Sequence, residues 1–141
     1  MNDKNAEILR NTFPKVYPEQ YPLAPLKRKM PFEFRCYDGW FNLIYDLSQK
    51  ISSEIEKVAA QTGEQWEPIA IQVKEKDGRL RFYIKKITDT IVSAIGEATI
   101  ISEATCEICG QPGIMRTKRI GRRDWSKVRC DDCWEEECRN E

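Results

Sequence analysis

Four cysteines near the C-terminus have a spacing that is typical of a metal site. Cys106 and Cys109 form one C-x-x-C unit, and Cys130 and Cys133 form a second unit after twenty intervening residues. Each unit offers two thiolates from one turn, and two such turns supply the corners of a tetrahedron around Zn²⁺. Because four thiolates leave no open coordination position, we expect a structural zinc ion whose binding is coupled to folding.

The remaining cysteines leave one alternative open. Cys138 follows Cys133 closely enough in sequence to replace it as the fourth ligand. Cys36 is most simply interpreted as a small buried apolar residue. A disulfide framework is not favoured, because we expect no secretion signal and the cysteines are arranged in metal-binding pairs. Histidine is absent, so a zinc site must be all-thiolate or must borrow a carboxylate.

Clustered cations between the two cysteine pairs suggest an anion-binding surface. Residues 115–129 contain seven Lys and Arg against one acid, a net charge of +6. Gly121 predicts a hairpin tip in this segment. The expected anion contacts are Arg119, Arg122, Arg123 and Trp125, since arginines beside an aromatic ring suit phosphate contacts and base stacking. Residues 130–141 carry a net charge of −5, so this acidic tail can instead neutralise the hairpin.

A second basic surface is expected on a central β-hairpin. Segments 69–76 and 79–86 flank Asp77-Gly78, which suits a two-residue turn with positive φ. One face then carries Gln72, Lys74, Lys76, Arg79, Arg81, Tyr83 and Lys85, with Lys74 opposite Arg81 and Lys76 opposite Arg79. A four-residue loop would shift these partners by two residues and leave the faces unchanged. Like charges placed opposite each other destabilise a sheet by up to about 1 kcal/mol per pair. Acidic side chains, an anionic ligand or solvent must therefore cover this face.

The other hairpin face and two helices are expected to form the core. The predicted core face consists of Ile69, Ile71, Val73, Leu80, Phe82 and Ile84. Helical periodicity predicts a helix from Trp40 to Gln61, with Asp38 capping its start and Gly63 ending it. A second helix is predicted from Thr88 or Asp89 to about Glu103, with a buried stripe of Ile91, Ile95 and Ala98.

Five prolines in residues 1–35 prevent a long helix at the N-terminus. We expect a short helix from Asp3 to Asn11, followed by an extended arm or, alternatively, a loosely ordered tail. The expected anchors of the arm are Phe13, Tyr17, Tyr21, Leu23 and Leu26.

The predicted fold class is α+β, with two helices packed on a small antiparallel hairpin. Three parts are expected: a proline-rich arm (1–35), an α/β core (36–104) and a zinc ribbon with an acidic tail (105–141). The formal net charge is zero, so attraction to an anion must come from local patches. No apolar run is long enough to span a membrane, and we expect a soluble, cytoplasmic protein.

The run from Val73 to Tyr83, VKEKDGRLRFY, resembles the "VKEKFGGLRFY" segment of a family of small uncharacterised phage and bacterial proteins. Residues 13–17 resemble the "P-K-L-Y" element of that family, residues 32–44 its "FE…GDGW..LI" element and residues 106–113 its "CEICGxPG" element. The resemblance covers nearly the whole chain. It implies a compact α+β domain with a zinc knuckle, often phage-encoded, and no particular biochemical activity.

The chain departs from this family at two places. Members often end the zinc motif with "W..TLC..H", whereas here Trp125 and Cys130 are followed by Cys133, which preserves a ligand. The family commonly has an aromatic residue and then glycine in the hairpin turn, whereas this chain has Asp77 before Gly78. This second departure leaves the hairpin intact and changes what its tip contacts.

We expect a non-enzymatic zinc protein whose basic surfaces bind an anionic partner, either nucleic acid or a nucleotide. The phage context implied by the resemblance suggests that it blocks or sequesters a host defence component. An alternative is a protein–protein interaction module that modulates a host protein complex. A third interpretation is a metal-dependent nuclease using Glu33, Asp38 and Glu75. No catalytic residues are expected, because familiar catalytic motifs are missing. The identity of the partner and the oligomeric state stay open.

Overall fold

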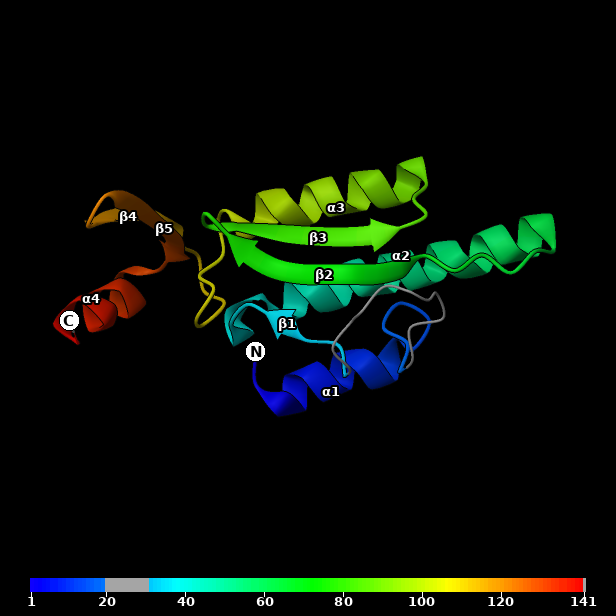
Figure 1. The fold of residues 1–141 in the computed structure, drawn as a ribbon, viewed down its shortest axis with the longest axis horizontal. Coiled ribbons are helices and arrows are strands. Elements are labelled where there is room, and N and C mark those ends of the chain that lie inside the picture. The colour runs from blue at the N-terminus through cyan, green and yellow to red at the C-terminus, as the bar shows by residue number, and fades with distance from the viewer. Residues whose placement is uncertain (20–30, 141) are drawn as a thin grey trace.

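The computed structural model describes residues 1–19 and 31–140 as an α+β protein, which confirms the expected fold class (Figure 1). The elements, in chain order, are α1 (Asp3–Thr12), β1 (Phe34–Arg35), the 3-10 helix η1 (Asp38–Trp40), α2 (Phe41–Thr62), β2 (Ile69–Lys76), β3 (Arg79–Lys85), α3 (Asp89–Ser102), β4 (Ile114–Ile120), β5 (Arg123–Arg129) and α4 (Asp131–Arg139). Within the described residues, β1, β2 and β3 form one sheet, and β4 and β5 form another.

Strands β2 and β3 form the expected antiparallel hairpin. The pairs predicted for a two-residue turn are all present: Lys76–Arg79, Lys74–Arg81 and Gln72–Tyr83. Asp77 and Gly78 have φ angles of 53° and 78°, which suit a turn whose twist matches that of the flanking strands. The like-charged pairs are therefore real features of the hairpin.

Strand β1 was not among the predicted elements. It pairs in parallel with β2, with Phe34 opposite Val73 and Arg35 opposite Lys74, so the sheet has the order β1-β2-β3. Neighbouring residues on adjacent strands point to the same face of a sheet. Phe34 therefore joins Val73 in the core, and Arg35 joins Lys74 on the opposite face.

The prediction that Ile71 belongs to the core is wrong. The pairing of β2 with β3 shifts between Ala70 and Gln72, and Ile71 is 42% exposed. Such a bulge adds one residue to one strand and so breaks the alternation of faces. Ile69 is buried as predicted, and Ala70 next to it is buried as well. Of the other predicted core residues, Val73, Leu80 and Phe82 are buried and Ile84 is partly buried.

Helices α2 and α3 run alongside the strands (Figure 1) and pack on the face that carries Val73, Leu80 and Phe82. Their buried apolar residues are Leu43, Ile44, Leu47, Ile51 and Ile55 from α2, and Ile91, Ala94 and Ala98 from α3. Ile95, which was expected on the buried stripe of α3, is only partly buried. This packing leaves the opposite face of the sheet free of described helices.

The helix ends follow the predictions with one exception. Gly63 ends α2 in the left-handed region with φ 68°, and Thr88 caps α3 by accepting a hydrogen bond from Ile91 N. Asp38, however, does not cap α2. Its carboxylate accepts hydrogen bonds from the backbone N–H of Asn2 at 2.9 Å and from the side chain of Asn5 at 3.0 Å. It therefore ties α1 to η1.

The N-terminal segment begins with the expected short helix, α1. Phe13 and Tyr17 are buried, as expected for anchors, and the hydroxyls of Tyr17 and Ser48 lie 2.7 Å apart. The other three expected anchors, Tyr21, Leu23 and Leu26, lie outside the described residues. Together with Phe32 and Phe34, which are also buried, the described part of the segment thus adds four aromatic side chains to the core.

The C-terminal part consists of the predicted hairpin, β4–β5, and an additional helix, α4, where an acidic tail was expected. Gly121, at the hairpin turn, has φ 62°. Among residues 1–19 and 31–140, no helix combines the length and the apolar character that crossing a bilayer requires.

Comparison of Ile69 with Ile71 tests the bulge, because the same substitution is made at neighbouring positions of one strand. We expect Ile69→Ala to lower the free energy of unfolding by about 2–5 kcal/mol, since it leaves a cavity in the core. Ile71→Ala should lower it by less than about 1 kcal/mol, because that side chain is already partly solvated. Urea denaturation of both variants measures the difference. Equal losses would contradict the bulged register.

Candidate metal centre and basic surfaces

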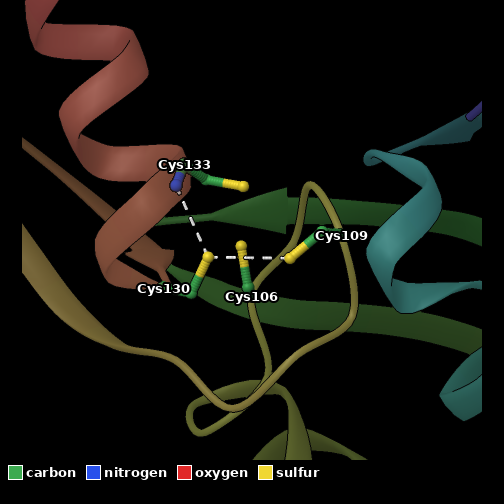
Figure 2. Close-up of side chains that lie close together, drawn as sticks. All are labelled: Cys106, Cys109, Cys130 and Cys133. Atoms are coloured by element: carbon green, nitrogen blue, oxygen red, sulfur yellow. Dashed lines mark hydrogen bonds between the residues drawn. The ribbon is translucent and has the colours of Figure 1, made fainter.

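The four predicted cysteine ligands lie together, as Figure 2 shows. Their sulfur atoms are all within 4.8 Å of one another, and the sulfurs of Cys109 and Cys130 are 3.6 Å apart. A metal–sulfur bond of about 2.3 Å gives a tetrahedron with edges of about 3.8 Å. The donor set therefore fits a four-coordinate, thiophilic metal ion.

The two cysteine pairs come from different local structures. Cys106 and Cys109 lie in a tight loop after α3, where Gly110 has φ 80° and donates a backbone hydrogen bond to Cys106 O. Cys130 caps α4 by accepting a hydrogen bond from Cys133 N, and Cys133 lies in the first turn of that helix. Cys138, further along α4, is exposed and outside the group. The geometry thus favours Cys133 over Cys138 as the fourth ligand.

The thiols have unequal acidities. Burial acts to raise the pKa of Cys106, but hydrogen bonds from the backbone of Cys109, Cys130 and Ile108 outweigh it and lower the pKa to about 7. Burial, together with hydrogen bonding to the other cysteines, raises the pKa of Cys133. Since thiolates bind metals and thiols do not, a bound cation would be needed to keep all four sulfurs ionised at neutral pH.

The loop that carries the first cysteine pair is docked on η1. Gly39 N donates a hydrogen bond to Glu107 O at 2.8 Å, and the indole N–H of Trp40 donates to Thr105 O at 2.9 Å. The approach is so close that a Cβ atom on Gly39 would lie 2.2 Å from Cys106 O. Only glycine fits at this contact, which joins the candidate metal centre to the core.

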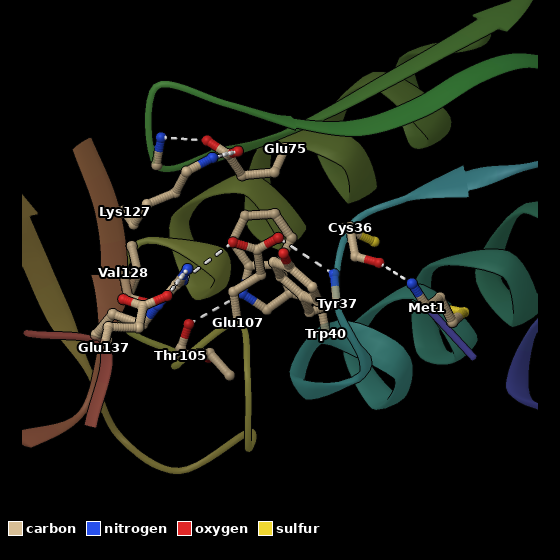
Figure 3. A network of polar contacts seen from close by, with 12 residues as sticks. Met1, Cys36, Tyr37, Trp40, Glu75, Thr105, Glu107, Lys127, Val128 and Glu137 are labelled. Atoms are coloured by element: carbon tan, nitrogen blue, oxygen red, sulfur yellow. Dashed lines mark hydrogen bonds and ion pairs between the residues drawn. The ribbon is translucent and has the colours of Figure 1, made fainter. Parts of the chain in front are cut away.

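A buried ion pair that involves Glu107, which Figure 3 labels, also joins the candidate metal centre to the core. Arg129, at the end of β5, donates to Glu107 at 3.1 Å, and the two side chains are 1% and 2% exposed. Glu107 also accepts from Tyr37 N, and Glu137 of α4 binds the other side of the guanidinium at 3.0 Å. Burial raises the pKa of the Glu107 carboxyl, and the hydrogen bond from Arg129 opposes that rise.

Much of the positive charge in residues 115–129 is paired with acidic side chains of the same chain. Besides Arg129, Arg116 pairs with Asp131, Lys127 pairs with Glu75, and Arg119 lies 3.9 Å from Asp124. The acidic C-terminal segment therefore neutralises part of the hairpin, as the alternative interpretation allowed. Arg122 and Arg123 are exposed at the hairpin tip, where the described residues offer them no ion pair.

The expectation that Trp125 serves as a base-stacking platform beside these arginines is not supported. Its ring is only partly exposed and stacks on Trp134 of α4, with ring centroids 6.4 Å apart. The ammonium group of Lys118 lies over the same ring, 4.5 Å from its centroid. Trp125 thus joins α4 to the hairpin.

The second predicted basic surface is intact. We call the side of the sheet opposite α2 and α3 the outer face, which consists of Arg35, Gln72, Lys74, Lys76, Arg79, Arg81, Tyr83 and Lys85. Arg79 pairs with Glu103 at 3.0 Å, and Arg35 lies 3.9 Å from Glu33. Within residues 1–19 and 31–140, no acidic group pairs with Lys74, Lys76 or Arg81. Arg35, which the sequence analysis missed, is brought to this face by β1.

The three carboxylates considered for nuclease chemistry do not form a site in the described structure. Asp38 binds Asn2 and Asn5, and Glu75 accepts from Gly78 N and pairs with Lys127. Among the described residues, the four cysteines are the only group of three or more His, Cys, Asp or Glu that can hold a metal ion.

Substitution of Cys133 and Cys138 distinguishes the two ligand assignments. We expect the parent chain and Cys138→Ser to bind one Co²⁺ per chain, with the intense sulfur-to-metal absorption of a four-thiolate site. Cys133→Ser should bind more weakly and with reduced charge-transfer absorbance, because one thiolate is missing. Spectrophotometric titration measures both properties. Loss of the signal in Cys138→Ser alone would overturn the assignment.

The close contact at Gly39 predicts a large effect from one methyl group. We expect Gly39→Ala to lower the free energy of unfolding by about 1–3 kcal/mol, since the added atom meets backbone that cannot rotate away. Gly96→Ala is the matched control: its added methyl would meet nothing within 4 Å, and alanine in a helix interior should stabilise the chain by up to about 1 kcal/mol. Urea denaturation with metal bound measures both. Equal effects would show that the loop and η1 are not in contact.

Comparison of the chain with protein-family models, with curated proteins and with solved structures finds no match.

Proposed function

We propose that this chain is a zinc-stabilised protein that binds nucleic acid through its outer face. The observation that carries the proposal is the pairing of Lys74 with Arg81 directly across two strands, with no acidic partner among the described residues. Such a pair is unfavourable in the absence of a ligand. An anionic partner would relieve the repulsion and gain two charge-assisted contacts.

Zinc is the metal that best suits the four cysteines. Soft thiolate ligands in a closed tetrahedral set are characteristic of structural Zn²⁺ sites. The role we assign to the ion is to hold the loop of Cys106 and Cys109 against the start of α4. In that position the β4–β5 hairpin supports the turn of the β2–β3 hairpin, because Gly78 lies against Met115 and Ser126.

Nucleic acid is the favoured anion because the cations of the outer face are repeated. Paired residues lie about 4.5–5.5 Å apart, and the Lys76–Arg79 pair follows the Lys74–Arg81 pair two residues, or about 7 Å, further along the strands. A ligand with several linked phosphates can contact both pairs at once. Residues 20–30, outside the described part, contain three basic residues and no acidic residue, so they offer no carboxylate to neutralise this face.

A protein–protein interaction module is a second candidate. It is motivated by exposed apolar side chains on α3, where Val92, Ile100 and Ile101 are 49%, 70% and 51% exposed. Co-purification of a protein partner that withstands nuclease treatment and high salt would favour this function. Nothing in the described residues points to a host defence component in particular.

The salt dependence of binding tests the proposed function. We expect the zinc-loaded chain to bind labelled oligonucleotides with an affinity that falls steeply as salt concentration rises, since phosphate contacts release counterions. The double variant Lys74→Gln/Arg81→Gln should weaken binding and reduce the slope of log K against log salt by about 1.4, or about 0.7 per lost contact on a single strand. Fluorescence anisotropy at several salt concentrations measures both quantities.

The matched control is Lys50→Gln/Lys57→Gln, which removes the same charge from α2 beside α3. It should leave both affinity and slope nearly unchanged. Equal losses in the two double variants would indicate non-specific attraction by overall charge. Absence of salt-dependent binding to any oligonucleotide would reject the proposed function.

A further inference from the structure

The outer face carries an exposed aromatic ring in line with its cations. Tyr83 is 48% exposed and lies opposite Gln72, two residues along the strands from the Lys74–Arg81 pair. Alternate residues of a strand share a face and are separated by about 7 Å. The ring of Tyr83 and the neighbouring cations can therefore be contacted by one extended ligand. Unlike Trp125, Tyr83 has no aromatic or cationic group stacked on it among the described residues.

Arg35 extends this basic surface to a third strand. Because Arg35 pairs with Lys74 and Lys74 pairs with Arg81, the three cations form a row across β1, β2 and β3. Adjacent strands lie about 4.8 Å apart, so the row is about 10 Å wide. Arg35 is exposed, and its nearest acid, Glu33, is 3.9 Å away. The row thus presents three side chains to the same small region of a ligand.

The shape of the outer face favours a single strand over a duplex. Readout of all four base pairs in a duplex uses an element, such as a helix or a two-stranded ribbon, that enters the major groove. Here the ring of Tyr83 lies on the side of a sheet, and an aromatic ring can stack only on a base that is not already stacked within a duplex. Gln72, beside Tyr83, offers an amide that can bond to the edge of such a base.

We infer that the outer face binds single-stranded nucleic acid, with a base stacked on Tyr83 and phosphates held by the row of Arg35, Lys74 and Arg81. This inference rests on the proposed function and makes it specific in three ways. It names the form of the nucleic acid, it assigns a role to a residue that carries no charge, and it adds a cation from outside the hairpin.

Binding of the zinc-loaded full chain to three labelled probes tests the inference: dT12, U12 and a 12-base-pair dA·dT duplex. We expect the single strands to bind at least tenfold more tightly than the duplex at the same salt concentration. Tyr83→Ala should weaken binding of the single strands about 5- to 150-fold, while Tyr83→Phe, which keeps the ring, should bind like the parent. The affinities for dT12 and U12 show whether the sugar contributes.

Arg35 is tested with the same probes. Arg35→Gln should weaken dT12 binding and reduce the salt slope by about 0.7, whereas Lys57→Gln on α2 should change neither. Photocrosslinking of a 5-iodouracil in place of one thymine provides a second readout, and we expect the crosslink to map to the peptide that contains Tyr83. This readout also applies if Tyr83→Ala proves unstable to urea.

The outcomes separate the inference from the proposed function. Duplex binding as tight as single-strand binding, or unchanged binding by Tyr83→Ala while Lys74→Gln/Arg81→Gln still weakens it, would overturn the inference and leave nucleic-acid binding in place. Crosslinks that map only to the tip of the β4–β5 hairpin would likewise overturn it. Absence of salt-dependent binding to all three probes would overturn both.

Discussion

The position of β4, β5 and α4 relative to the rest of the protein depends on the buried ion pair between Glu107 and Arg129. Taking two charges out of water is costly, and such a pair contributes little net stability even when its geometry is good. Removing one partner, in contrast, leaves an unpaired buried charge and typically costs about 3–5 kcal/mol. The pair is therefore better understood as a constraint on position. Glu107 lies between two cysteines and Arg129 precedes a third, so the ion pair and the candidate metal centre fix the same backbone segments.

Elements with a clear apolar period, a cap or a turn residue could be predicted from the sequence, whereas β1, the bulge at Ile71 and α4 were not predicted. Helices α2 and α3 and the β2–β3 hairpin follow from spacing and turn chemistry. Strand β1 has only two residues, too few to show an alternation. The bulge at Ile71 was hidden because Ile69, Ala70 and Ile71 are all apolar, and an unbroken apolar run does not reveal which residue is displaced. Helix α4 carries a usable signal that was missed: Asp131 and Asp132 begin it, and Arg139 ends it.

The candidate site shows a similar division. The cysteine ligands were predictable because their spacing is set by the geometry of a single ion. The role of each lysine and arginine was not predictable, because a count of charges does not show which cations form ion pairs within the protein. Arg116, Lys127 and Arg129 contribute to the net charge of the 115–129 segment but bind acids from other elements. Arg35, which has no basic cluster around it in sequence, gains its position from a parallel strand pairing that only the fold reveals.

The proposed roles of the metal centre and the outer face are physically connected. The turn that joins the Lys76–Arg79 pair lies against Met115 and Ser126, and Glu75 in the same hairpin pairs with Lys127 of β5. Two contacts thus run from the basic hairpin to the strands that precede Cys130. If a ligand binds only the arrangement that these contacts hold, it must stabilise the metal-bound state, and the metal must in turn raise the affinity for the ligand. A structural ion then influences binding without touching the ligand, because it determines how rigidly one end of the outer face is held.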